Sequence, residues 1–178
     1  ITAHGRELLA LGLHPRLANA LRSAPRTLRA LACDVSALLE ARDPLRGEAR
    51  RDDDLRPRLQ ALQAFRAGRP DAYADRGALA LIDQAARLEL LGDDAVGDVQ
   101  DAGEVLALAY PDRIAHQDRN DPLRYQLSSG RGARLHPDSR LRGEPWLAVA
   151  ELRQDDKDSL IQRAAPVSRG FLEAAFPA

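Results

Sequence analysis

Residues 113–137 read RIAHQDRNDPLRYQLSSGRGARLHP, and this stretch decides the fold of the second part of the chain. Short apolar segments are separated in it by the turn-forming runs DRNDP and SSGRG, a punctuation typical of short strands. Together with two later apolar segments, the pattern predicts five strands at residues 113–117, 123–127, 133–136, 146–152 and 160–164. Five short strands in about 55 residues predict a small β-barrel. A final helix is expected after the cap residue Ser168.

The first part of the chain has the apolar spacing of helices. Leu28, Leu31, Val35 and Leu38 are three or four residues apart, which places them on one helix face. The same periodicity predicts helices in residues 8–11, 17–21, 55–65, 71–90 and 101–108. Because the spacing changes near Tyr110-Pro111, we expect a helical domain at residues 1–110 and a barrel domain at residues 111–178. The predicted fold class is α+β, a helical bundle followed by a small five-stranded OB-like barrel with a C-terminal helix.

Composition excludes several classes of protein. Apolar residues make up 44% of the chain and charged residues 30%. No stretch approaches the roughly 18 consecutive apolar residues of a membrane span, so no membrane association is expected. Cys33 is the single cysteine, which excludes an intrachain disulfide and predicts a reducing, cytoplasmic location; its place on an apolar helix face predicts an inert, buried thiol. Because Ile1 is neither methionine nor part of a leader, we expect a piece of a longer protein.

The sequence contains no recognisable catalytic centre. Lys157, the only lysine, is not part of a phosphate-binding GxxxxGK[ST] loop, and no acidic box for magnesium is present, so the chain is not expected to bind ATP. The four histidines lack the spacing of zinc ligands, so no metal or cofactor is expected. His136, Asp138 and Ser139 are near neighbours in one predicted turn, which favours a turn over a catalytic triad.

Charge is distributed unevenly along the chain. Residues 88–112 contain 7 acids and no base, whereas residues 113–142 contain 7 Arg against 3 Asp. A locally basic barrel suggests contacts with the phosphates of single-stranded RNA, but a solvated face explains the arginines equally well. The candidate RNA-binding residues are Arg119, Arg124, Arg131, Arg134 and the one aromatic of this segment, Tyr125. Core packing is the favoured role for Trp146, which leads an apolar run, and the polar run up to Asp54 is interpreted as a solvated surface linker.

Five blocks of the sequence resemble blocks of the HrpB-type, DEAH-related RNA helicases in the same order. They are Ile1 to Leu8 with Gly12 to Leu17, Leu31 to Leu45 with the string LLEARDPL, Leu106 to Ala115, Tyr125 to Ala133, and Gly143 to Leu152. The resemblance implies two RecA-like ATPase domains before Ile1, which would bind ATP and Mg²⁺, and a winged-helix domain that joins this chain at residues 1–22. It also implies that the helical domain is the helicase-associated domain and that the barrel is OB-like.

Two functional hypotheses follow from the resemblance. In the first, the chain is a non-catalytic accessory region of the RNA channel, bracing the ATPase core and contacting single-stranded RNA. In the second, it is a protein-interaction module of the same helicase, which docks a partner through the acidic residues 88–112 or an exposed barrel edge and does not touch RNA. Both hypotheses assign the enzymatic activity to the parent helicase and none to this chain.

Overall fold

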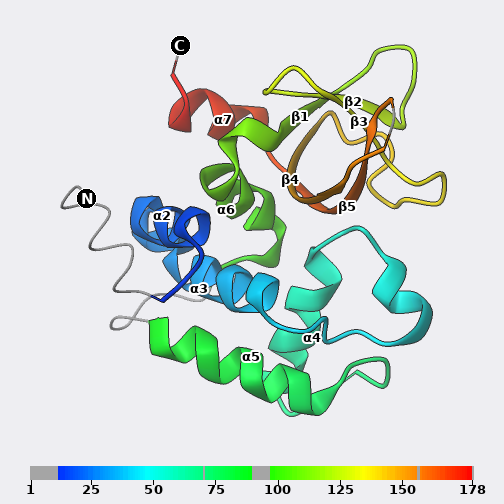
Figure 1. Cartoon of the computed structure of the whole chain (residues 1–178). Coiled ribbons are helices and arrows are strands. Elements are labelled where there is room, and N and C mark those ends of the chain that lie inside the picture. Colours follow the sequence, from blue (N-terminus) through cyan, green and yellow to red (C-terminus); the bar gives the residue numbers. More distant parts are fainter. Residues whose placement is uncertain (1–11, 70, 90–96, 156, 178) are drawn as a thin grey trace. The chain divides into compact units, whose positions relative to one another are not determined.

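The computed structural model describes residues 12–69, 71–89, 97–155 and 157–177. Two compact units are present, drawn in Figure 1. The helical unit comprises Ile1–Arg50 and Pro57–Val99, and the barrel unit comprises Arg51–Arg56 and Gln100–Ala178. The barrel unit thus includes Arg51–Arg56 from the predicted linker, and its continuous part begins at Gln100. The sequence pattern predicted a boundary at Tyr110-Pro111 instead. The assignment of the parts to named helicase domains stays a prediction.

The helical unit is built from α2 (Pro15–Ser23), α3 (Arg26–Glu40), α4 (Arg56–Arg66) and α5 (Arg76–Glu89), with a short 3-10 helix at Gly47–Arg51. Helix α3 packs against α2 and α5. Its predicted apolar face is buried, and Cys33 is buried with it, as expected. The helix predicted at residues 8–11 lies outside the described residues.

Helix α5 begins later than the sequence suggested. Asp71 was the predicted cap, but its Oδ1 accepts a hydrogen bond from the backbone of Tyr73 in a separate turn. Asp75 caps the helix instead, because its Oδ1 accepts from the backbone N–H of Ala78 at 3.0 Å. Both Asp71 and Asp75 could cap a helix by their position in the sequence, and their backbone hydrogen-bond partners show that Asp75 is the cap.

Arginine–aspartate pairs lie inside the helical unit. Arg58 on α4 is 1% exposed. Its Nε and Nη2 donate to Asp43, and Nη2 also donates to the carbonyl of Arg50 at 2.9 Å. Arg66 bridges α3 and α5 by donating to Asp34 and Asp83. The aspartate of the LLEARDPL string is therefore a structural anchor.

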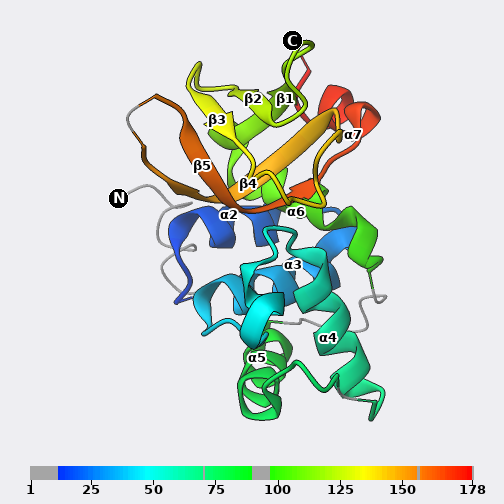
Figure 2. The same cartoon turned by 90° about the vertical axis from the view of Figure 1, so that its right-hand side faces the viewer.

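The barrel unit contains a closed barrel of five strands, which confirms the predicted α+β fold class with a small barrel and a C-terminal helix. The strands are β1 (Ile114–Gln117), β2 (Arg124–Leu127), β3 (Gly132–Arg134), β4 (Trp146–Arg153) and β5 (Ser159–Pro166). Their order around the barrel is β1-β2-β3-β5-β4, and β4 pairs again with β1. The β3–β5 pair is parallel and the other pairs are antiparallel. Figure 2 shows β4 and β5 as the long strands of the wall. The core is formed by Ala115, Tyr125, Leu127, Ala133, Leu135, Leu141, Leu147, Val149, Ile161 and Ala164.

Helices α6 (Ala102–Ala109) and α7 (Arg169–Ala175) accompany the barrel, with α6 packed on β4 and β5. A glycine permits this packing. A Cβ built on Gly103 would lie 1.8 Å from the carbonyl oxygen of Pro166, so only glycine fits at this contact. The predicted cap Ser168 accepts from the backbone of Phe171 and begins α7, as expected.

The end of the predicted surface linker is buried in the barrel unit. Ala164 of β5 donates its N–H to the carbonyl of Asp53 and accepts from the N–H of Leu55, both at 2.9 Å. Asp53 and Asp54 are 6% and 5% exposed. The prediction of a solvated linker is therefore wrong for these two residues, because their backbone pairs with β5 beside the barrel. We call residues 51–56 the strap.

Candidate nucleic-acid interface

Two of the four candidate arginines are ion-paired across the barrel surface. Arg124 on β2 and Arg134 on β3 are register partners, and their side chains are 50% and 44% exposed. Arg124 Nε donates to Asp158 Oδ2 at 3.1 Å, and Arg134 Nη2 donates to Asp121 Oδ2 at 2.8 Å. Each guanidinium therefore already binds a carboxylate.

A hollow of about 670 Å³ adjoins these two ion pairs. It is lined by Asp118, Asn120, Asp121, Arg124, Arg134, Lys157 and Asp158. Three carboxylates balance three cationic side chains in this lining, so it has no net charge at neutral pH. Phosphate binding depends on an excess of cations, so the hollow by itself is a poor phosphate site.

Arg119 and Arg131 are in a different situation. Both are exposed, and within the described part of the chain no hydrogen bond or ion pair of either guanidinium is found. Arg119 lies in the turn between β1 and β2, and Arg131 follows Gly130, whose φ of 87° suits glycine, in the turn between β2 and β3. The N–H of Leu127 donates to the carbonyl of Arg131 at 2.8 Å, which fixes that turn. These two side chains remain available to an anionic ligand.

Tyr125 does not fit the surface role predicted for it. Its side chain is 1% exposed and belongs to the barrel core. The hydroxyl donates to the carbonyl of Glu144 at 2.8 Å and lies 3.3 Å from that of Leu141. Burial raises the pKa of Tyr125 to about 12, which keeps this donor protonated. The alternation of β2 (exposed, buried, exposed, buried) signals this inward position.

The prediction for Trp146 was also wrong. Trp146 was predicted to be a core residue, but it is only partly buried, and the core position in β4 belongs to the next residue, Leu147. The indole contacts the exposed imidazole of His116, with 4.3 Å between ring centroids and a tilt of 42°. From the sequence, His116 was considered only as a metal ligand, and its pairing with Trp146 was not predicted. The cross-strand register of β1 and β4, which no single segment reveals, brings the rings together.

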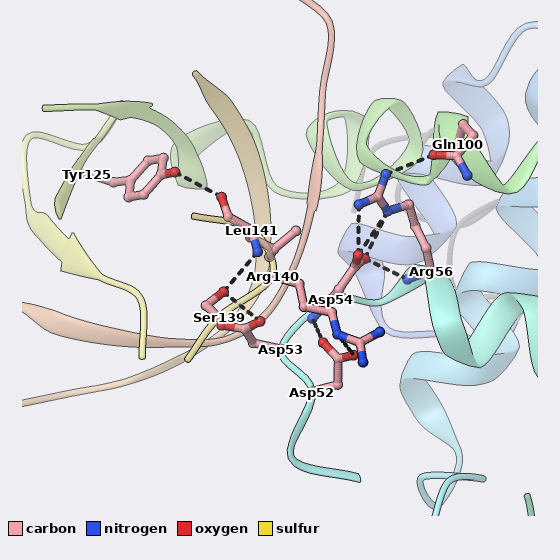
Figure 3. A network of polar contacts seen from close by, with 9 residues as sticks. All are labelled: Asp52, Asp53, Asp54, Arg56, Gln100, Tyr125, Ser139, Arg140 and Leu141. Carbon is pink, nitrogen blue, oxygen red and sulfur yellow. Dashed lines mark hydrogen bonds and ion pairs between the residues drawn. The ribbon is translucent and has the colours of Figure 1, made fainter. Parts of the chain in front are cut away.

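Figure 3 shows the polar network of the strap. The Ser139 hydroxyl donates to Asp53 Oδ1 at 2.9 Å and accepts from the N–H of Leu141 at 3.1 Å. Asp54 is held by Arg56, whose Nη2 lies 2.8 Å from Oδ2 and whose Nη1 donates to Gln100. Polar groups of the strap thus fasten it to the barrel unit through side chains as well as backbone.

The charged form of the buried Asp53 carboxylate is destabilised by its surroundings. Burial raises its pKa above the ordinary value of 3.8, and the charges of Asp52 and Asp54 act in the same direction, while the hydrogen bond from Ser139 opposes them. Asp53 Oδ2 has no hydrogen-bond partner among the described residues. Charged Asp53 is therefore less favourable in the folded barrel than in water.

The turn that contains Ser139 is no hydrolytic triad. His136 Nδ1 accepts from the backbone N–H of Asp138 at 3.3 Å, and the Ser139 hydroxyl is directed to Asp53. The nucleophile and the base of such a triad must instead be hydrogen-bonded to each other. Among the described residues, no group of three or more His, Cys, Asp or Glu side chains could hold a metal ion. No helix in the described ranges is long and apolar enough to cross a membrane.

Comparison with known proteins gives one kind of match. No family model and no curated sequence matches this chain. Two solved structures of HrpB from Escherichia coli do, one described as a DExH-box NTPase and the other as a DEAH/RHA helicase. The first is 28% identical over 99% of this chain, with a TM-score of 0.74, and the second 26% identical over 95%, with a TM-score of 0.71.

This chain corresponds to 20% of the first HrpB chain and 19% of the second, so it spans about a fifth of their length. The match follows nearly the whole of this chain, helical and barrel units included. Likeness in sequence and fold together is more specific than the sequence blocks alone. The resemblance to the HrpB-type DExH/DEAH helicases that the motifs indicated is thereby confirmed.

Proposed function

We propose that this chain is a non-catalytic accessory region of an HrpB-type ATP-dependent RNA helicase, in which the barrel contacts single-stranded RNA and the helical unit braces the ATPase core. The similarity to about a fifth of each E. coli HrpB chain supports a place within a larger helicase. The missing phosphate loop supports a non-catalytic role. ATP and Mg²⁺ are then bound by RecA-like domains outside this chain, next to a winged-helix domain.

We also propose that the barrel is OB-like. The strand order β1-β2-β3-β5-β4, closed by the β1–β4 pair, supports this proposal, as does the length of about 55 residues. Barrels of this kind bind single strands through a charged groove together with stacking rings. The fold itself leaves open which face is used, so the contact must be argued from the side chains.

The observation that carries RNA contact is the pair of exposed guanidinium groups in the turns on either side of β2. Arg119 and Arg131 are in solvent, whereas Arg124 and Arg134 bind Asp158 and Asp121. A free guanidinium binds phosphate without first losing a carboxylate partner. The contact is therefore to the backbone of the strand, tolerant of sequence and sensitive to salt.

Salt-dependent binding of a labelled single-stranded RNA by the 178-residue chain tests the proposal. The double variant Arg119→Ala/Arg131→Ala should bind more weakly to all sequences. Its slope of log affinity against log salt should be shallower by about 0.7 for each lost contact. The matched control is Arg124→Ala/Arg134→Ala, which removes the same charge from paired positions and should change the slope less.

Two results would contradict RNA contact by the barrel. One is the absence of RNA binding at low salt; the other is an unchanged affinity and slope in the Arg119→Ala/Arg131→Ala variant. Either would favour the protein-interaction module, in which RNA touches only other domains of the helicase.

A further inference from the structure

His116 and Trp146 belong to a row of outward positions that crosses four segments of the barrel wall. His116 is the register partner of Trp146 on β4 and of Gln126 on β2, and Gln126 is the partner of Gly132 on β3. The neighbouring Ala115 and Leu147 point into the core. Because side chains alternate along a strand, the row His116, Trp146 and Gln126 faces outward.

The two rings of this row form a fixed pair. Trp146 is partly buried and His116 is exposed, with their ring centroids 4.3 Å apart. A purely structural role is available, since cross-strand ring pairs stabilise a sheet. A structural role does not explain why the imidazole is exposed while the larger indole ring holds it in a defined orientation. A ring held in place before binding loses less conformational entropy when a ligand stacks on it.

The surroundings of the pair favour an anionic ligand. The N–H of Gln117 donates to the carbonyl of Pro145 at 3.0 Å, so the turn that follows β1 and the turn that precedes β4 meet at one end of the barrel. Exposed Arg119 lies in the first turn and exposed Arg142 in the second. Arginines in the turns that adjoin the two ring-bearing strands suit a polymer that combines phosphates with planar bases.

We propose that His116, supported by Trp146, is a stacking platform for one base of single-stranded RNA. The proposal rests on the proposed RNA contact of the barrel and adds a base contact to its phosphate contacts. The base lies on the imidazole, and the outward amide of Gln126 is the neighbouring group in the row. Stacking of this kind is tolerant of sequence, because every base has a ring face.

Trp146 provides a direct readout, because it is the only tryptophan of the chain. The experiment titrates the chain with oligouridine and with an abasic ribose-phosphate strand of equal length, following tryptophan fluorescence and the anisotropy of labelled strands. The abasic strand keeps the phosphates and lacks the bases. Oligouridine should change the fluorescence of Trp146, and the abasic strand should bind more weakly and leave the fluorescence unchanged.

Three variants define the platform. His116→Ala should weaken oligouridine binding at least about fivefold and leave abasic binding and the salt slope unchanged, since one stacked base contributes about 1–3 kcal/mol. His116→Phe keeps a ring and should restore binding. Gln126→Ala, a matched outward position in the same row, should have a smaller effect than His116→Ala.

The outcomes separate this inference from the proposed function. Salt-sensitive RNA binding with unchanged Trp146 fluorescence and unaffected His116→Ala affinity would overturn the platform and leave the phosphate contacts standing. Absence of any RNA binding would overturn both. Equal affinity for oligouridine and the abasic strand would likewise overturn the platform, because the bases would then contribute nothing.

Discussion

Two arginines of the helical unit contrast with two arginines of the barrel unit. In the helical unit, Arg58 is 1% exposed and Arg66 connects three helices through Asp34 and Asp83, so these guanidinium groups are part of the fold. In the barrel unit, Arg119 and Arg131 are in solvent. An arginine count alone is thus a poor guide to RNA binding, and the partner and burial of each side chain decide its role.

The largest expected effect concerns the buried pair of the helical unit. Asp43→Ala removes the carboxylate that accepts from the Nε and Nη2 of Arg58, a cation whose side chain is 1% exposed. We expect the free energy of unfolding to fall by about 3–5 kcal/mol, the usual cost of breaking a buried ion pair. Urea denaturation followed by circular dichroism measures it. Arg119→Ala is the control and should cost within about 0.5 kcal/mol. A loss below about 1 kcal/mol in Asp43→Ala would mean that the buried Arg58 pair contributes no more to stability than an exposed ion pair.

The packing of α6 against β5 in the barrel unit should contribute less to stability than the buried ion pair of the helical unit. Gly103→Ala places a methyl group 1.8 Å from the carbonyl oxygen of Pro166, which forces α6 away from β5. We expect a loss of about 1–3 kcal/mol, typical of overpacking, in thermal or urea unfolding. Gly170→Ala is the matched control. A Cβ built on Gly170 would have nothing within 4 Å, and alanine should stabilise helix α7 slightly. Equal effects of both substitutions would contradict the close contact.

Local periodicity accounts for the parts of the fold that were predicted well. The five strands, helix α3 and the cap Ser168 follow from spacing and turn residues within short windows. The strap was missed because its burial depends on backbone pairing of Asp53 and Leu55 with Ala164, far along the chain. Three adjacent aspartates are usually solvated, and no residue near them in the sequence indicates that the backbone pairs with β5.

The candidate site was predicted in part for the same reason. Arg119, Arg124, Arg131 and Arg134 look alike in the sequence, and only the folded barrel gives two of them carboxylate partners. The alternation of β2 could have placed Tyr125 inside, because Leu127 on the same face is an evident core residue. The His116–Trp146 pair joins two strands that are far apart in the sequence, so its prediction required the strand register.

The stability of the strap should depend on pH differently from that of the buried ion pairs of the helical unit, because Asp53 has a serine rather than an arginine as its partner. Its raised pKa, caused first by burial, means that the folded state binds the proton more tightly than the unfolded state. The stability from this group is therefore fully present below the unfolded value near 3.8 and is lost as pH rises through the higher folded pKa.

Asp53→Asn should remove this pH dependence. The difference in the free energy of unfolding between Asp53→Asn and the unaltered chain should shift in favour of the variant as pH rises from about 3 to 7. Ser139→Ala removes the hydrogen bond that lowers the pKa, so it should extend the loss of stability to higher pH. Urea unfolding at several pH values measures both. A difference that shifts in the other direction would show that charged Asp53 is stabilised in the folded barrel.

The smallest expected effect lies at the paired arginines of the barrel. Arg124 and Asp158 form an ion pair at 3.1 Å with half of the arginine side chain exposed, so water and salt screen it. A double-mutant cycle of Arg124→Ala and Asp158→Ala should give a coupling energy of about 0.2–1 kcal/mol, decreasing with added salt. A coupling energy that approached the effect of Asp43→Ala would mean that this exposed pair of the barrel unit stabilises the fold as much as the buried pair of the helical unit. It would also make Arg124 part of the fold, and the Arg124→Ala/Arg134→Ala control for RNA binding would then need to be replaced by Arg134→Ala alone.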